Sequence, residues 1–301
     1  MVVPTRRVLM VAVSLAVIPA LVAPADAHRR RARKPSTAGQ AAPTPPAPPP
    51  VSPPTWVPAS TAAVLPGVQT FTEGAQCTSN FVFTDAAGAV YLGQAAHCSG
   101  TGGPTATDGC DSASLPLGTP VKVAGASKPG ILAYNSWITM QGRKEQDKNA
   151  CQYNDLALVR LDPADVAKVN PSVPFFGGPT ALATAGTSAG DAVYSYGNSG
   201  LRQGLAALSP KRGVSLGDSG GGWSHNVFTV SPGVPGDSGS AFLDATGKAL
   251  GVLSTLQILP LVGSNGVGDL SRELAYLNAH AGLPAMTLAP GTEPFKGTRL
   301  L

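Results

Sequence analysis

Three short stretches of this 301-residue chain carry side chains suited to nucleophilic catalysis. The segment 236–240 reads Gly-Asp-Ser-Gly-Ser and places Ser238 between glycines. A serine hydroxyl is a weak nucleophile at neutral pH, and it becomes a strong one when an imidazole takes its proton and a buried carboxylate orients that imidazole. His97, in Ala-Ala-His-Cys, and Asp155, in Asn-Asp-Leu-Ala-Leu, supply these two groups. We therefore predict that His97, Asp155 and Ser238 act together.

Each of these residues also has an ordinary structural explanation. A single histidine is more often a structural or surface residue than a base, and an aspartate before a strand is usually a turn residue. The order His, Asp, Ser along the chain favours a joint role. The glycines beside Ser238 fit that role, because they allow positive φ values and let backbone N–H groups face an oxyanion.

A second serine competes with Ser238. The segment 217–221 reads Gly-Asp-Ser-Gly-Gly around Ser219, but no apolar hairpin follows it to seat the turn. Ser238 is preceded by one expected strand (227–230) and followed by two within 241–253. We therefore assign Ser238 and interpret Ser219 and His225 as residues of a Gly-rich surface loop.

Composition limits the fold and the classes of partner. With 36 glycines and 29 prolines, the chain favours short strands and turns over long helices. From Val68 onward it has 14 lysines and arginines against 16 aspartates and glutamates, a net charge of about −2. No basic cluster predicts nucleic-acid binding there. The cysteines (77, 98, 110 and 151) lack C-x-x-C spacing, so we expect no metal and no cofactor.

The first 67 residues read as export and spacer segments. Residues 1–27 have two arginines, an apolar run and an Ala-Asp-Ala cleavage site, which predict a signal peptide. Residues 28–67 combine a basic run (29–34) with 11 prolines from Pro35 to Pro66, which is typical of a disordered or polyproline-II linker or a pro-segment. We expect the basic run to be a solvated tail, with cell-wall contact or processing as open alternatives.

The remaining chain, 68–301, is predicted to be mainly β. Regularly spaced short apolar runs, including Trp137–Met140, predict strands in a sandwich or barrel. A helix over about 269–281 is expected, with Asp269 as its cap and Gly282 at its end. Four cysteines in an exported chain suggest two disulfides, and three pairings are open.

The three motifs together resemble those of chymotrypsin-like serine peptidases of the secreted bacterial kind, over about residues 76–282. The resemblance implies an all-β fold of two six-stranded antiparallel β-barrels with the active site between them and a C-terminal helix. We place barrel one at about 68–165 and barrel two at about 175–268. It also implies that Cys98 pairs with Cys77 and that Cys110 then pairs with Cys151.

The same resemblance assigns roles to residues. Ser238 is the nucleophile, His97 the general base and Asp155 the group that orients it, while the N–H groups of Gly236 and Ser238 form the oxyanion hole. Ser254 matches the family serine that supports the aspartate. Substrate contacts are expected from the following residues: Pro232, Ser254, Thr255 and Leu256.

The sequence departs from the family pattern near the pocket. Pro232 stands where trypsin-like members have the aspartate that selects basic residues, and Leu253 stands where glutamate-selective members have a histidine. We therefore expect an apolar or small pocket. No Ile-Val-Gly-Gly start is present to pair with Asp237. Either another residue holds Asp237, or cleavage within 28–67 matters.

These observations predict a secreted serine endopeptidase that works through an acyl-enzyme on protein or peptide substrates. We expect a monomer, without nucleic-acid partners or stable membrane insertion, located outside the cell. Two alternatives remain open. One is an exported, catalytically weak binding domain on this fold, and the other is an esterase or acyltransferase that uses the same three residues.

Overall fold

The computed structural model describes residues 54–103 and 106–297. The predicted signal peptide and most of the predicted linker lie outside these residues. Fourteen strands are present in them: β1 (Gln69–Thr72), β2 (Ala75–Thr78), β3 (Val82–Asp85), β4 (Val90–Ala95), β5 (Pro120–Val123), β6 (Gly130–Asn135), β7 (Leu156–Arg160), β8 (Ala192–Tyr196), β9 (Pro210–Ser219), β10 (Ser224–Thr229), β11 (Ala241–Leu243), β12 (Ala249–Gln257), β13 (Ser264–Asp269) and β14 (Met286–Leu288).

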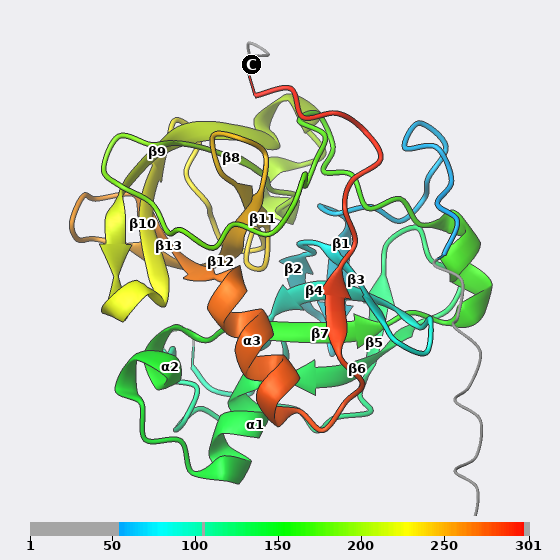
Figure 1. The fold of residues 1–301 in the computed structure, drawn as a ribbon, viewed down its shortest axis with the longest axis horizontal. Coiled ribbons are helices and arrows are strands. Elements are labelled where there is room, and N and C mark those ends of the chain that lie inside the picture. The colour runs from blue at the N-terminus through cyan, green and yellow to red at the C-terminus, as the bar shows by residue number, and fades with distance from the viewer. Residues whose placement is uncertain (1–53, 104–105, 298–301) are drawn as a thin grey trace, which may run out of the picture. The chain divides into compact units, whose positions relative to one another are not determined.

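The strands form two antiparallel sheets (Figure 1). The second is a closed barrel of six strands in the order β10-β13-β12-β11-β8-β9, as predicted. The first has eight strands in the order β14-β3-β4-β7-β6-β5-β1-β2, so the expected count of six is wrong for it. The difference arises partly because β14, from the end of the chain, adds to the edge of β3.

Three α-helices accompany the sheets in the described residues: α1 (Ser136–Arg143), α2 (Lys148–Tyr153) and α3 (Leu270–His280). Helix α3 matches the predicted C-terminal helix, and Asp269 caps it by accepting the Arg272 N–H at 2.9 Å. Figure 1 shows α3 leaving β13 and lying beside β7. No helix in the described part of the chain is long and apolar enough to cross a membrane.

Helix α1 replaces a predicted strand. The run Trp137–Met140 is apolar enough for a strand, but Asn135 stops β6 and starts a helix. Its side-chain oxygen accepts the N–H groups of Trp137 and Ile138 at 2.9 and 3.4 Å, which is the geometry of a helix N-cap.

The folded part of the chain begins before residue 68, earlier than predicted. Val64 is fully buried, and its N–H donates to the Lys168 carbonyl at 3.1 Å. Its own carbonyl accepts the Asn170 N–H at 3.0 Å. The last part of the expected linker therefore packs on the first sheet, because it brings an apolar side chain that can be buried there.

Buried apolar side chains fill the barrel and join it to the first sheet. The barrel interior contains Ala183, Val193, Val227, Phe242, Leu250, Leu253 and Val267. A larger cluster takes residues from both sheets and from α3, including Phe83, Leu158, Val252 and Leu274. This shared core fixes the facing ends of β4, β7 and β12.

Candidate active site

The register of β4 against β7 places His97 next to Asp155. Ala95 pairs with Leu156 at the end of this ladder, so the residues just after β4 lie beside the residue just before β7. The Ala96 N–H donates to the Asp155 carbonyl at 2.7 Å. A disulfide joins Cys98 to Cys77, and a second joins Cys110 to Cys151, as predicted. The first disulfide ties the turn that carries His97 to β2.

The Asp155 carboxylate accepts three hydrogen bonds. They come from the backbone N–H of His97 at 2.9 Å, from His97 Nδ1 at 2.7 Å and from the Ser254 hydroxyl at 2.6 Å. The Asp155 side chain is only 3% exposed. Because a carboxylate only accepts hydrogen bonds, Nδ1 must carry the proton, and Nε2 remains as the basic nitrogen.

The charge of Asp155 also determines the basicity of the imidazole. Burial lowers the pKa of His97, but the adjacent Asp155 carboxylate outweighs burial through its charge and its hydrogen bond. The pKa of His97 therefore lies above its ordinary value. Such a ring is a stronger proton acceptor than free imidazole.

A β-bulge directs Ser254 towards Asp155. On β12, Leu253 pairs with Val267 and Thr255 pairs with Gly266, which leaves Ser254 as the extra residue. Bulges re-aim side chains in this way. Ser254 therefore bonds Asp155 while Leu253 points into the barrel core.

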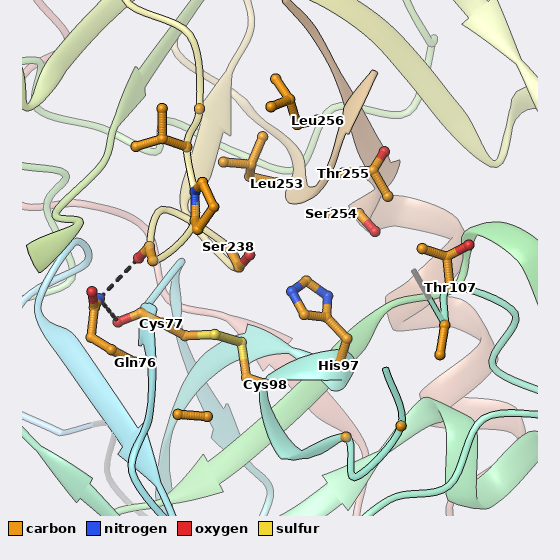
Figure 2. Close-up of a pocket in the computed structure, with 18 of the residues that line it drawn as sticks. Gln76, Cys77, His97, Cys98, Thr107, Ser238, Leu253, Ser254, Thr255 and Leu256 are labelled. Carbon is orange, nitrogen blue, oxygen red and sulfur yellow. Dashed lines mark hydrogen bonds between the residues drawn. A yellow bond between two sulfur atoms is a disulfide. The ribbon is translucent and has the colours of Figure 1, made fainter. Parts of the chain in front are cut away.

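Ser238 lies in the turn between β10 and β11 and lines the same cavity as His97 (Figure 2). Within the described residues, no hydrogen bond joins the two side chains. The turn is fixed by backbone contacts. The Ser238 carbonyl accepts the Thr78 N–H at 2.9 Å, and the Gly239 N–H donates to the Leu253 carbonyl at 2.7 Å. Gly239 has φ +88°, and a Cβ there would come within 2.8 Å of the Ala95 nitrogen, so the position requires glycine.

Two serine hydroxyls orient the N–H groups of Gly236 and Ser238. Ser199 donates to the Pro235 carbonyl at 2.6 Å, and Ser240 donates to the Asp237 carbonyl at 2.5 Å. In a trans peptide the N–H points away from the C=O, so each hydroxyl also fixes the direction of the following N–H. Neither N–H donates to an acceptor in the described chain. Both are thus available to an external oxyanion.

Asp237 is held by two internal cations. Its carboxylate lies 2.5 Å from Arg202 Nη2 and 3.0 Å from Lys211 Nζ, and the side chains of Asp237 and Lys211 are fully buried. Burial alone would raise the pKa of Asp237, but the two cations keep it below its usual value. Burial lowers the pKa of Lys211. Of the two alternatives left open by the sequence, the described residues support a partner other than a new N-terminus.

The cavity has a volume of about 560 Å³ and opens between the two sheets. Of the predicted substrate contacts, Ser254, Thr255 and Leu256 line it, whereas Pro232 does not. Pro232 instead offers its carbonyl to Lys211 and Arg202 at 3.2 and 3.3 Å. The structure does not bring Pro232 to the cavity surface, and its role in substrate binding stays a prediction.

Asn265 lines the cavity and was not identified from the sequence. Its side chain joins two of the cavity walls. Oδ1 accepts the Gly233 N–H at 2.8 Å, and Nδ2 donates to the Thr255 carbonyl at 3.1 Å. A Cβ on Gly233 would lie 2.7 Å from Leu253 Cδ2, so Gly233 and Leu253 already pack closely against each other. No sequence motif marks Asn265, because its role depends on the pairing of β12 with β13.

The second Gly-Asp-Ser-Gly sequence lies elsewhere in the barrel. Ser219 ends β9, and His225 on β10 is fully buried, so the prediction that His225 is a surface residue is wrong. His225 Nδ1 lies 2.6 Å from Asp218, and Nε2 lies 3.1 Å from Asp269. Two carboxylates raise the pKa of His225 despite its burial, which by itself lowers it. Ser219 does not line the cavity.

No protein-family model and no curated protein sequence matches the chain. Similar solved structures include Thermobifida fusca Protease A, with 17% identity, a TM-score of 0.49 and coverage of 76% of this chain and 100% of that one. The Nocardiopsis protease NAPase has 18% identity, a TM-score of 0.46 and coverage of 75% and 98%. A glutamic acid specific serine protease has 20% identity, a TM-score of 0.45 and coverage of 70% and 96%.

These neighbours are chymotrypsin-like serine proteases of bacteria, the class that the sequence motifs resemble.

Proposed function

We propose that the chain is a serine endopeptidase that hydrolyses peptide bonds through an acyl-enzyme. The observation that carries this proposal is the His97–Asp155 pair, in which Nδ1 is bonded to a buried carboxylate while the ring lines a cavity shared with Ser238. A histidine held in this way has Nε2 as its only basic nitrogen. Such an arrangement suits proton transfer from a serine.

In this mechanism the Ser238 hydroxyl attacks the substrate carbonyl as its proton passes to His97 Nε2. The C–N bond then breaks, His97 returns the proton to the departing amine, and the acyl group stays on Ser238. Water then attacks the acyl-enzyme ester as His97 Nε2 takes its proton. The bond between the acyl carbon and Ser238 Oγ breaks, His97 returns the proton to Ser238, and the acid leaves. The N–H groups of Gly236 and Ser238 stabilise the oxyanion in both steps, typically by about 3 kcal/mol per donor.

We propose that the substrate residue before the scissile bond is small and uncharged. Asn265 bridges the walls formed by Gly233 and Thr255, which limits the depth of the cavity. Behind Pro232 lie two cations, Arg202 and Lys211, with one carboxylate between them. Both cations are already paired with Asp237, and no described residue that lines the cavity carries a carboxylate to pair with a lysine or arginine side chain.

We also propose that the enzyme is secreted. The predicted signal peptide supports export, and two disulfides are typical of proteins in oxidising compartments outside the cytosol. The basic and proline-rich segment that follows would then serve as a spacer, with cell-wall contact as the alternative.

Fluorophosphonate labelling tests the proposed activity. The protein purified after export from a bacterial host should be labelled at Ser238, as located by peptide mass spectrometry. Ser238→Ala should abolish the label, and Ser219→Ala, the matched control, should retain it. A label on Ser219, or none on the exported chain, would contradict the proposal. Turnover of esters without turnover of any peptide would instead favour an esterase or acyltransferase.

The substrate preference is tested with p-nitroanilide peptides that differ only at the residue before the scissile bond. Alanine should be preferred over phenylalanine, arginine and glutamate. Asn265→Ala should raise kcat/KM for phenylalanine relative to alanine by about 10-fold, the scale of discrimination that pocket size provides. Asn226→Ala, on neighbouring β10 and away from the cavity, is the control. An unchanged ratio in Asn265→Ala would show that Asn265 does not limit the pocket.

A further inference from the structure

A buried glutamate lies directly behind the proposed catalytic aspartate. Glu273, on α3, is fully buried, and its Oε1 accepts the backbone N–H of Asp155 at 2.9 Å. It does not line the cavity, so a role in substrate contact is not indicated. An acidic side chain with no exposure is rare in proteins unless it is paired.

The surroundings of Glu273 favour its neutral form. Among the described residues, no cation lies within ion-pairing distance of it. Burial raises the pKa of Glu273 well above its usual value, the Asp155 N–H lowers it in part, and the charges of Asp155 and Asp269 raise it further. These surroundings shift the equilibrium of the Glu273 carboxyl group towards its protonated form.

The titratable groups facing Glu273 come from several elements. Asp155 lies at the start of β7, and His97 reaches Glu273 only through Asp155. Asp269 caps α3, with His225 from β10 on its other oxygen. Tyr134 on β6 has a buried hydroxyl, and the pKa of Tyr134 is raised by burial and then by Glu273.

Tyr276, one turn further along α3, donates its hydroxyl to Glu145 at 2.8 Å, and it also raises the pKa of Tyr134. The acidic groups on these elements carry negative charge when ionised. Each of the two histidines is already hydrogen-bonded to a carboxylate other than Glu273.

The chain makes specific room for this carboxyl group. A Cβ on Gly268 of β13 would lie 3.0 Å from Glu273 Cδ and 3.1 Å from the Tyr153 carbonyl, so glycine is needed there. The helix is also anchored at its start. Asp269, four residues before Glu273, caps α3 and accepts a hydrogen bond from His225 at 3.1 Å. Residues four apart share a helix face, so this anchor fixes Glu273 as well.

We propose that Glu273, as a neutral carboxylic acid, is a positioning residue that holds the Asp155 backbone in the place where its carboxylate meets His97 and Ser254. This inference rests on the proposed function. An aliphatic residue would leave the Asp155 N–H buried without an acceptor. A glutamate anion would place a second negative charge beside Asp155 in a poorly solvated site, and the two carboxylates would repel.

Two substitutions separate the acceptor from the proton. Glu273→Gln keeps the acceptor and is neutral at every pH, so kcat at neutral pH should stay within about 3-fold of wild type. Glu273→Leu removes the acceptor, and kcat should fall about 10-fold with KM unchanged, the scale of one lost hydrogen bond to a buried group. Leu277→Ala, in the core on the same helix, is the control: it should lower stability and leave kcat unchanged.

The pH profile gives a readout that a purely structural role would not move. In wild type, kcat should decline at alkaline pH as Glu273 ionises, whereas Glu273→Gln should remain on its plateau there. The acidic limb, set by His97, should be the same in both proteins.

Fluorophosphonate titration of active sites accompanies each assay. A wild-type chain that does not label at Ser238 overturns the proposed function and this inference with it. If the wild type labels, a folded Glu273→Leu with wild-type kcat overturns the inference alone. A Glu273→Gln variant as impaired as Glu273→Leu also overturns it. Should Glu273→Leu not fold, Glu273→Gln decides: the loss of the alkaline limb supports the inference, and an unchanged limb contradicts it.

Discussion

The chain contains Gly-Asp-Ser-Gly twice, and each copy has a histidine–carboxylate pair within the same fold. His97 is 28% exposed and has one nitrogen bonded to a carboxylate. His225 is fully buried, and both of its nitrogens lie against carboxylates. An imidazole can serve as a general base only if one nitrogen is free to take a proton. By this criterion His97 qualifies and His225 does not.

The backbone around the two serines differs in the same way. Residues 217–219 lie in β9 and pair with β10, with Asp218 opposite His225 and Ser219 opposite Ser224. Residues 236–238 belong to a turn outside the ladders, and the N–H groups of Gly236 and Ser238 are not used within the described chain. The same four letters therefore produce a strand end in one place and, in the other, a turn in which two N–H groups have no acceptor among the described residues. The two copies differ because the backbone of the first pairs with a neighbouring strand in a ladder, whereas the backbone of the second lies outside the ladders.

The largest effect should separate the two histidines. His97→Ala should lower kcat/KM by about 10⁴-fold or more without a large loss of stability, because it removes the proposed base. His225→Asn should change the turnover of folded protein far less, but it should lower the free energy of unfolding by about 3 kcal/mol, since the buried Asp269 loses one of its partners. Steady-state kinetics and urea unfolding measure both. Retained activity in His97→Ala would reverse the assignment.

A smaller effect is expected where a hydroxyl supports each carboxylate. Ser254 donates to Asp155 at 2.6 Å, and Thr187 donates to Asp218 at 2.8 Å. Ser254→Ala should lower kcat by about 10-fold, which corresponds to about 1.4 kcal/mol in the transition state. Thr187→Val should leave kcat unchanged and lower stability by about 1 kcal/mol. Equal effects of Ser254→Ala and Thr187→Val on kcat would show that the His97–Asp155 and His225–Asp218 pairs do not differ in function.

The smallest effect concerns pH, and its direction differs for the two histidines. The pKa of His225 is raised in the folded state, so its stabilising contribution is complete below about 6.5 and is lost as the pH rises through the folded value. The difference in unfolding free energy between wild type and His225→Asn should therefore shrink as the pH is raised. Activity should instead rise with pH as His97 loses its proton. Unfolding measured in a Ser238→Ala background, which prevents self-digestion, tests this. A difference that grows with pH would contradict it.

The sequence predicts best where chemistry and local pattern coincide. Residues 95–98 and 154–158 mark the turn and strand that carry His97 and Asp155, and Asp269 with Gly282 marks both ends of α3. Where the partner is distant along the chain, the prediction fails. His225 follows a Gly-rich segment, which predicts an exposed residue. It is buried instead and hydrogen-bonds to Asp269, 44 positions away.

Some of what was missed left a trace in the sequence. Glu273 lies between Leu270, Leu274 and Leu277 on the apolar face of α3, and an acidic residue on a buried face indicates a specific partner. The cap by Asn135 is local, and asparagine is a favoured N-cap residue, so this trace was present in the sequence and was missed. The role of Asn265 left no such trace, because it depends on which strand lies opposite. The eighth strand of the first sheet is of the same kind, since β14 is too short to be recognised outside its pairing with β3.

The pairing of β14 with β3 affects the order in which the first sheet can form. Thr84 and Thr287 meet across β3 and β14 although they lie 203 positions apart. A ribosome makes β14 after the other thirteen described strands, so the outer edge of β3 stays unpaired until all of these have been synthesised. Unpaired edges invite association with other chains, and distant pairings form slowly. The addition of β14 thus covers the edge of the sheet whose strands precede His97 and follow Asp155, and a chain that is cut short before Met286 keeps that edge open.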